Sequence, residues 1–168
     1  VIAKIDSTNG DVLRVTPYAM SVSTITAAHG IAVDSDGGVY VCGIKPYAKD
    51  AVVAKFSETG VLLWETVVGT TGHDSCDALA LTSDAVYAVG NMADWSAKPE
   101  LSPTELGITG SGGAQNDVFV LQLGKSDGSI TWATSVHGMG RDIGTGIAVS
   151  GTDIFIAATL STGATWPG

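Results

Sequence analysis

The chain has 168 residues and a mass of 17.0 kDa, which fits one domain or part of one. Its 8 Lys and Arg residues against 17 Asp and Glu residues give a net charge of −9, which excludes a protein that tracks nucleic-acid phosphates. Hydrophobic residues make up 45% of the chain, which excludes disorder, and no apolar run approaches the roughly 20 residues of a transmembrane helix.

Short apolar runs separated by Gly and Asp turns follow one another along the chain, which is the pattern of β-strands. No stretch sustains a helical period, so the sequence predicts an all-β protein. The predicted strands are 1–5, 10–14, 30–34, 39–43, 52–56, 60–64, 78–82, 86–90, 119–123, 128–132, 146–150 and 154–158.

These strands recur in a fixed order, which divides a single domain, residues 1–168, into three repeat units. The units are 1–49, 50–116 and 117–168. Each unit begins with two apolar strands joined by a Gly turn and ends with two strands rich in small residues.

Four strands per repeat, one of them crowded with small residues, predict a β-propeller. A strand such as Gly30–Asp34 suits the innermost position, where blades converge, and the strand that ends at Trp64 suits the wide rim. With strands named A to D from the inside outward, the chain would begin at a C strand and end after a B strand. The prediction is a propeller segment of about three four-stranded blades, two complete and two halves at the ends. We expect this segment to be incomplete, with further sequence favoured over another chain as its continuation; a β-solenoid is the competing fold.

The third unit carries five short motifs, which in order are Asp117–Val120, Asp127–Trp132, Gly138–Asp142, Gly146–Val149 and Ile154–Ile156. Together they resemble the bacterial-type β-propeller repeat, the SBBP repeat. The first unit departs from the pattern, because Arg14 stands where the repeat has Trp. The resemblance implies a scaffold, usually seven-bladed and extracellular or in the cell envelope, with no catalytic residues in the repeat.

The second unit also has Ala54, Thr59-Gly60 and Trp64 at a fixed spacing. This spacing is similar, though more weakly, to the tryptophan-docking motif of quinoprotein propellers. Phe56 stands where that motif has an acidic residue. This resemblance implies a quinone-dependent redox enzyme, which is the alternative to a non-enzymatic protein.

The connections between predicted strands fall into two classes. The A–B and C–D turns, such as Asp34–Gly38, are tight and suit hairpins built on Gly and Asp. The D–A and B–C connections emerge on the opposite face and include the longest one, Asn91–Asn116. Because long connections in compact domains are often functional, we expect a protein or carbohydrate ligand to be recognised on that face.

Candidate ligand-binding residues on this face are His73, Asp74, Trp95, Arg141 and Asp142. Asp74 and Asp142 close repeated turns, and the favoured interpretation is that each carboxylate accepts backbone N–H bonds and fixes the next strand. Trp95 is a candidate aromatic platform. The three histidines fall on different predicted blades, so no metal site is predicted. The sequence also indicates no cofactor and no set of catalytic residues.

The two cysteines fall in neighbouring blades. Cys42 ends a B strand and Cys76 begins the next A strand, on the same face. They are either two small buried thiols or a disulfide that staples the blades and indicates an oxidising compartment.

The sequence as a whole predicts a non-enzymatic, acidic β-propeller module, secreted or at the cell surface, that serves as a scaffold or binding module. A quinoprotein-like redox enzyme is the first alternative. The second is a structural subunit that assembles with other chains through its open blade edges.

Overall fold

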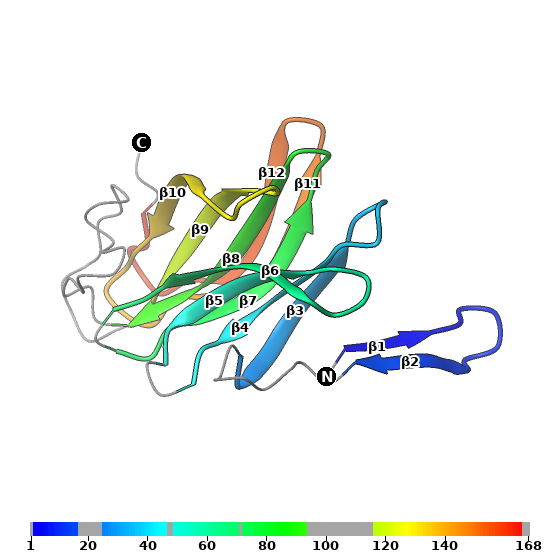
Figure 1. Ribbon diagram of the computed structural model, residues 1–168. Helices are drawn as coiled ribbons and strands as arrows, with labels where there is room; N and C mark the ends of the chain where they lie inside the picture. Colours follow the sequence, from blue (N-terminus) through cyan, green and yellow to red (C-terminus); the bar gives the residue numbers. More distant parts are fainter. Residues whose placement is uncertain (1, 17–24, 47–48, 71, 94–115, 166–168) are drawn as a thin grey trace.

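The computed structural model describes residues 2–16, 25–46, 49–70, 72–93 and 116–165 (Figure 1). The all-β prediction is confirmed, because the described residues form strands and turns and no helix. There is accordingly no helix in these ranges that could cross a membrane.

Twelve strands lie within the described residues, and each overlaps one predicted run. They are β1 (Ile2–Ile5), β2 (Val12–Thr16), β3 (Ala27–Val33), β4 (Val39–Ile44), β5 (Ala51–Phe56), β6 (Leu62–Val68), β7 (Ser75–Leu81), β8 (Ala85–Ala93), β9 (Asn116–Gly124), β10 (Ile130–Val136), β11 (Ile143–Ser150) and β12 (Asp153–Thr159).

The strands form four antiparallel sheets in which neighbours in the sheet are neighbours in the chain. Two sheets have four strands, β3–β4–β5–β6 and β7–β8–β9–β10, and we call them the complete sheets. The other two are hairpins, β1–β2 and β11–β12, which we call the half sheets. Tight turns between consecutive strands account for this order, since antiparallel strands need only a few linking residues.

The repeat is visible in the strand register. The first two strands of three sheets each shift register at the same point, between Ala28 and Gly30, between Cys76 and Ala78, and between Gly144 and Gly146. One extra residue lies at each shift, as in a β-bulge. These bulge residues are His29, Asp77 and Thr145.

Two hairpin turns also match each other. The Gly10 N–H donates to the main-chain oxygen of Asp6, and the Gly128 N–H donates to that of Gly124, both at 2.9 Å. Gly10 and Gly128 have φ angles of 79° and 72°, which glycine adopts without strain. The β1–β2 and β9–β10 turns are therefore built alike.

The first strands of three sheets lie side by side, with β7 packed against β3 on one side and β11 on the other (Figure 1). A Cβ atom on Gly30 would lie 2.9 Å from Cys42 Sγ and 3.1 Å from Ala78 Cα. A Cβ atom on Gly144 would lie 2.7 Å from Val89 Cγ2. Glycine is required at these two positions because the sheets approach so closely.

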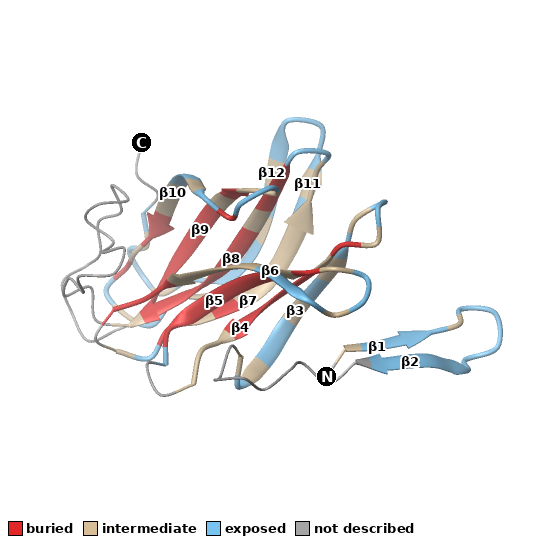
Figure 2. Ribbon diagram, viewed as in Figure 1, coloured by how far each residue is buried: buried red, intermediate tan, exposed pale blue. Residues whose placement is uncertain are grey.

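The core lies in the middle strands of the two complete sheets, β4, β5, β8 and β9 (Figure 2). Its largest fully buried side chains are Tyr40, Phe119, Met92 and Leu121. The half sheets differ, because most residues of β1 and β12 are exposed. What is interior in a complete sheet is surface in a half sheet.

Candidate functional site

The D–A and B–C connections meet at one end of the sheets, which we call the loop end. The Asp74 N–H donates to the main-chain oxygen of Lys49, and the Asp142 N–H donates to that of Asn116, both at 2.7 Å. The first bond reaches the connection before β5, and the second reaches the first residue of β9. Backbone hydrogen bonds therefore join neighbouring sheets at this end.

Asp74 is fully buried at the loop end, and both oxygens of its carboxylate accept hydrogen bonds. It accepts the N–H of Thr70 at 2.5 Å, the hydroxyl of Thr70 at 2.9 Å and the N–H of Ala93 at 2.8 Å. Burial raises the pKa of Asp74 against the effect of these hydrogen bonds, and the nearby Asp50 carboxylate raises it further.

Asp142 occupies the same position in the next sheet and is also fully buried. Its Oδ1 accepts the N–H of Ser161 at 2.5 Å, whereas its Oδ2 is buried and has no hydrogen-bond partner among the described residues. Gly138 stands where Thr70 stands in the earlier repeat, so no hydroxyl reaches Oδ2. Both carboxylates thus accept backbone N–H bonds, as the favoured interpretation of these residues expects. A ligand-binding role for Asp74 and Asp142 stays a prediction.

The other three candidate residues differ in what the structure says of them. His73 and Arg141 are exposed, each directly before its buried Asp, so both side chains are accessible at the loop end. Trp95 lies outside the described residues.

Cys42 and Cys76 are both buried, and both are free thiols in this structure. Burial raises the pKa of the Cys76 thiol well above its ordinary value, and its hydrogen bond with Cys42 adds to the effect. The two side chains therefore meet across neighbouring sheets, as their strand positions predict. A disulfide between them stays a prediction.

Two bulge residues form a pair that the sequence did not predict. Nδ1 of His29, on β3, lies 2.8 Å from Oδ1 of Asp77, on β7. Oδ2 of Asp77 accepts bonds from Asn91 Nδ2 at 2.6 Å and from Ser75 Oγ at 2.9 Å. We call His29, Ser75, Asp77 and Asn91 the bulge cluster.

The bulge cluster links three sheets and remains accessible. The amide oxygen of Asn91 accepts the N–H of Gly144 on β11 at 2.9 Å. The His29 and Asp77 side chains are 33% and 22% exposed. With Nδ1 of His29 held by the carboxylate, Nε2 is the ring nitrogen that remains for an outside partner. The Ser75 hydroxyl donates to the carboxylate rather than to the imidazole, which differs from a Ser-His-Asp nucleophile arrangement.

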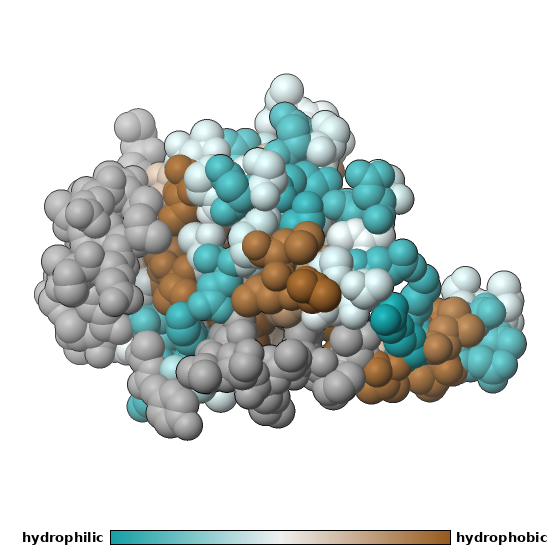
Figure 3. All heavy atoms as spheres, in the orientation of Figure 1, coloured by the Kyte–Doolittle hydropathy of each residue, from teal (hydrophilic) through white to brown (hydrophobic). Residues whose placement is uncertain are grey.

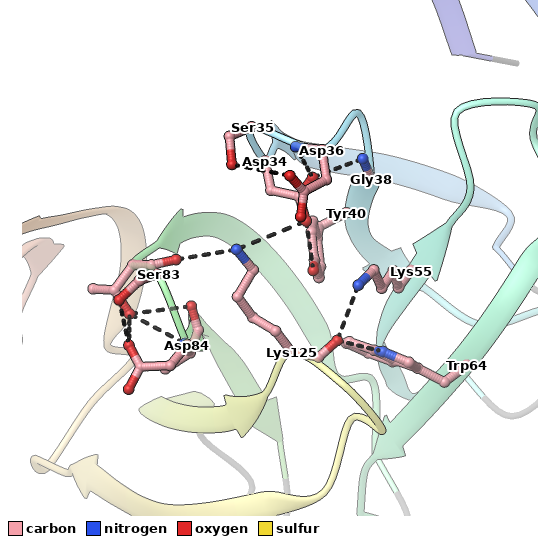
Figure 4. A network of polar contacts seen from close by, with 12 residues as sticks. Asp34, Ser35, Asp36, Gly38, Tyr40, Lys55, Trp64, Ser83, Asp84 and Lys125 are labelled. Atoms are coloured by element: carbon pink, nitrogen blue, oxygen red, sulfur yellow. Dashed lines mark hydrogen bonds and ion pairs between the residues drawn. The ribbon is translucent and has the colours of Figure 1, made fainter.

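A second polar network lies at the opposite end, around Lys125 of the β9–β10 turn (Figure 4). Its Nζ donates to the main-chain oxygen of Thr82 at 3.1 Å and lies 3.7 Å from Oδ2 of Asp34. Its main-chain oxygen accepts Lys55 Nζ at 3.2 Å and Trp64 Nε1 at 3.1 Å. Lys125 thereby joins the two complete sheets with both its side chain and its backbone.

Asp34 is the anionic partner in this network. Burial opposes its ionisation, but the Gly38 N–H, the Tyr40 hydroxyl and the Lys125 ammonium outweigh burial and lower the pKa of Asp34. Burial and the same Asp34 carboxylate raise the pKa of Tyr40 well above its ordinary value. The turn 34–38, predicted only as a hairpin, is thus also an anchor between sheets.

Among the described residues, no group of three or more His, Cys, Asp or Glu side chains could hold a metal ion. No protein-family model matches the chain, and no curated protein matches it either.

Proposed function

We propose that the chain is a segment of a β-propeller that serves as a non-enzymatic binding module, secreted or at the cell surface. The packing of β7 between β3 and β11 supports the propeller, because first strands that lie side by side are what radially arranged blades require. The recurrence of the bulge at one position in three sheets supports a repeated blade.

The observation that carries the binding proposal is the pair formed by His29 and Asp77. Both residues lie near the start of first strands, directly after the loop-end connections, so the bulge cluster belongs to the loop end. Exposed His73 and Arg141 lie in the D–A connections of the same end. An imidazole oriented by a carboxylate, with an amide beside it, offers both donors and acceptors.

We propose a carbohydrate as the ligand in preference to a protein, because clustered hydroxyl groups match mixed donors and acceptors in a partly exposed setting. The experiment is an array of immobilised oligosaccharides probed with the labelled chain and with two variants. His29→Ala removes the oriented imidazole, whereas Asp36→Ala changes an exposed side chain at the opposite end of the sheets.

The proposal expects a set of glycans that bind the wild-type chain and its Asp36→Ala variant equally. The amount of His29→Ala bound by the same glycans should be at least tenfold lower. Equal retention of both variants would place recognition elsewhere. A quinone absorbance band in the purified protein would instead favour the redox-enzyme alternative.

A further inference from the structure

Among the described residues, the exposed acidic side chains lie at the end of the sheets opposite the loop end, which we call the turn end. Each of the six hairpins carries one exposed carboxylate in or beside its turn. In chain order these residues are Asp11, Asp36, Glu58, Asp84, Asp127 and Asp153. Hydrophilic residues accordingly cover the tips of the β1–β2 and β3–β4 turns (Figure 3). The exposed negative charge of the described chain is therefore concentrated at one end.

The acidic residues of the loop end are, by contrast, buried or paired. The buried ones are Asp50, Asp74, Asp117 and Asp142. The Asp77 carboxylate belongs to the bulge cluster, with Nδ1 of His29 at 2.8 Å. Glu65 pairs with Lys45, whose Nζ lies 2.8 Å from its Oε1. Within the described ranges, no carboxylate of the loop end is left both exposed and unpaired.

Two exposed cationic residues of the loop end flank the bulge cluster. Lys49 precedes β5, and its main-chain oxygen accepts the N–H of Asp74, directly before Ser75 of the cluster. Arg141 lies three residues before Gly144, whose N–H donates to the cluster's Asn91 at 2.9 Å. Neither cation has an ion-pair partner in the part of the chain that the structure describes. Both charges are therefore available to a ligand of the cluster.

The carboxylates of the turn end are too distant to cancel these two charges. The strands that separate the ends have six to nine residues, as in β4 and β8. At about 3.3 Å per residue, the two ends are about 20–30 Å apart. Charges in solution at physiological ionic strength are screened over about 8 Å. The turn end therefore does not repel an anion that approaches Lys49 and Arg141.

We propose that the carbohydrate bound at the loop end carries carboxylate groups, as in an oligosaccharide of uronic acids. The inference rests on the carbohydrate binding proposed above and adds the class of sugar. Arg141 presents a planar guanidinium, which pairs with a carboxylate through two parallel hydrogen bonds, and Lys49 supplies a compact charge. A sugar chain with a carboxylate on each unit reaches both cations while its hydroxyl groups contact the bulge cluster.

A nucleic acid matches the same surface less well. Binding along a phosphate backbone depends on neutralising many phosphates, whereas the described loop end offers two unpaired, exposed Lys or Arg side chains. The imidazole and amide of the bulge cluster add donors and acceptors that suit hydroxyl groups. The combination of few cations with neutral polar groups favours an acidic sugar.

The backbone at Lys49 allows its charge to be removed without disturbing the fold. Lys49 has a φ of 58°, in the left-handed region, where Asn is enriched over most other side chains. Asn116 has the same place in the next sheet, since its main-chain oxygen accepts the N–H of Asp142 as Lys49 accepts that of Asp74. Lys49→Asn should therefore unfold at the temperature of the wild type or above it.

The test measures binding of the 168-residue chain to immobilised uronic-acid oligosaccharides. Oligogalacturonate, oligomannuronate and hyaluronan oligosaccharides are the probes, each beside its carboxyl-reduced, neutral form. At least one acidic probe should bind the wild type about tenfold more tightly than its neutral form, because reduction removes charge-assisted hydrogen bonds. Lys49→Asn and Arg141→Gln should each lose most of this preference. Lys4→Gln, which removes an exposed cation paired with Glu58 at the turn end, should keep it.

Equal binding of the acidic and neutral forms would overturn this inference and leave the carbohydrate proposal standing. No binding of any probe in either form would also overturn it, and the glycan array then decides the carbohydrate proposal separately. A preference retained by both Lys49→Asn and Arg141→Gln would overturn the role of these cations. Equally tight binding of a duplex DNA would overturn recognition of a sugar.

Discussion

The indole N–H of Trp64 donates to the main-chain oxygen of Lys125 at 3.1 Å, across the boundary between the two complete sheets. Arg14 makes the same contact one sheet earlier, donating from Nη1 to the main-chain oxygen of Glu58 at 3.0 Å. Both side chains are long and end in an N–H donor. The residue that interrupts the sequence repeat therefore preserves the contact that the repeat makes.

Replacing Trp64 by Phe should lower the free energy of unfolding by about 1 kcal/mol, because the ring is largely kept and the hydrogen bond to Lys125 is lost. Urea denaturation of the two proteins under identical conditions measures the difference. Leu63→Ala is the control, since this neighbour is exposed and should change stability by less than about 0.5 kcal/mol. A Trp64→Phe effect no larger than that of the control would mean that the contact does not hold the sheets together.

The strand order could be predicted because its determinants are local. Alternating apolar residues and Gly turns such as Asp34–Gly38 define each strand from its own residues. The contacts of Arg14 could not be predicted, since they depend on how two sheets are placed. Comparison of the three repeat units shows Arg14 only as a departure from the repeat.

Gly30 and Gly146 have the same position in β3 and β11 but different surroundings. Gly30→Ala should destabilise the chain by about 2 kcal/mol, because its Cβ would lie 3.1 Å from the Ala78 Cα of the adjacent sheet. Gly146→Ala should be within about 0.5 kcal/mol of the wild type, since the nearest atom, on Ala157, is 3.4 Å away. Thermal unfolding of both variants compares them, and equal losses would contradict the close approach of β3 and β7.

Lys125→Met should destabilise the chain at pH 7, and the loss should shrink as the pH falls below about 4. The reason is the lowered pKa of Asp34: a carboxylate with a depressed folded pKa adds stability above its unfolded pKa and loses it on protonation. Urea denaturation at a series of pH values gives the difference between the two proteins. A difference that stays constant down to pH 2 would show that Lys125 does not act through the Asp34 carboxylate.

Asp74→Ala should cost about 3 kcal/mol, because it leaves the buried donors of Thr70 and Ala93 without an acceptor. Asp36→Ala, a change of an exposed carboxylate, should cost less than about 0.5 kcal/mol. Denaturant titration separates the two variants. Similar small effects for both would return Asp74 to the list of candidate ligand-binding residues.

Cys42 and Cys76 should not react with a thiol reagent in the native chain, because both side chains are buried. The raised pKa of Cys76 also disfavours its reactive thiolate. Unfolding the reduced protein should release two thiols. If the reduced chain is instead unfolded and refolded in a glutathione redox buffer, the disulfide prediction expects no free thiol on a second unfolding without reductant. Two thiols after that treatment would reject the disulfide.

The candidate site was harder to predict than the fold, for a physical reason. His29 and Asp77 are 48 residues apart and meet because each occupies a bulge in adjacent sheets. A signal was present, since polar residues stand directly before Gly30 and Ala78 at one register position of the repeat. Asp74 and Asp142 could be found because a Gly turn that ends in Asp is a local pattern.

The most direct test of the arrangement of first strands is a nuclear Overhauser spectrum of the isotopically labelled chain. The account predicts cross-peaks between the Hα protons of Gly30 and Ala78 and between Gly144 Hα and the Val89 methyl groups, because these atoms meet across neighbouring sheets. Cross-peaks within each sheet but none between Gly30 and Ala78 would contradict sheets that converge on their first strands.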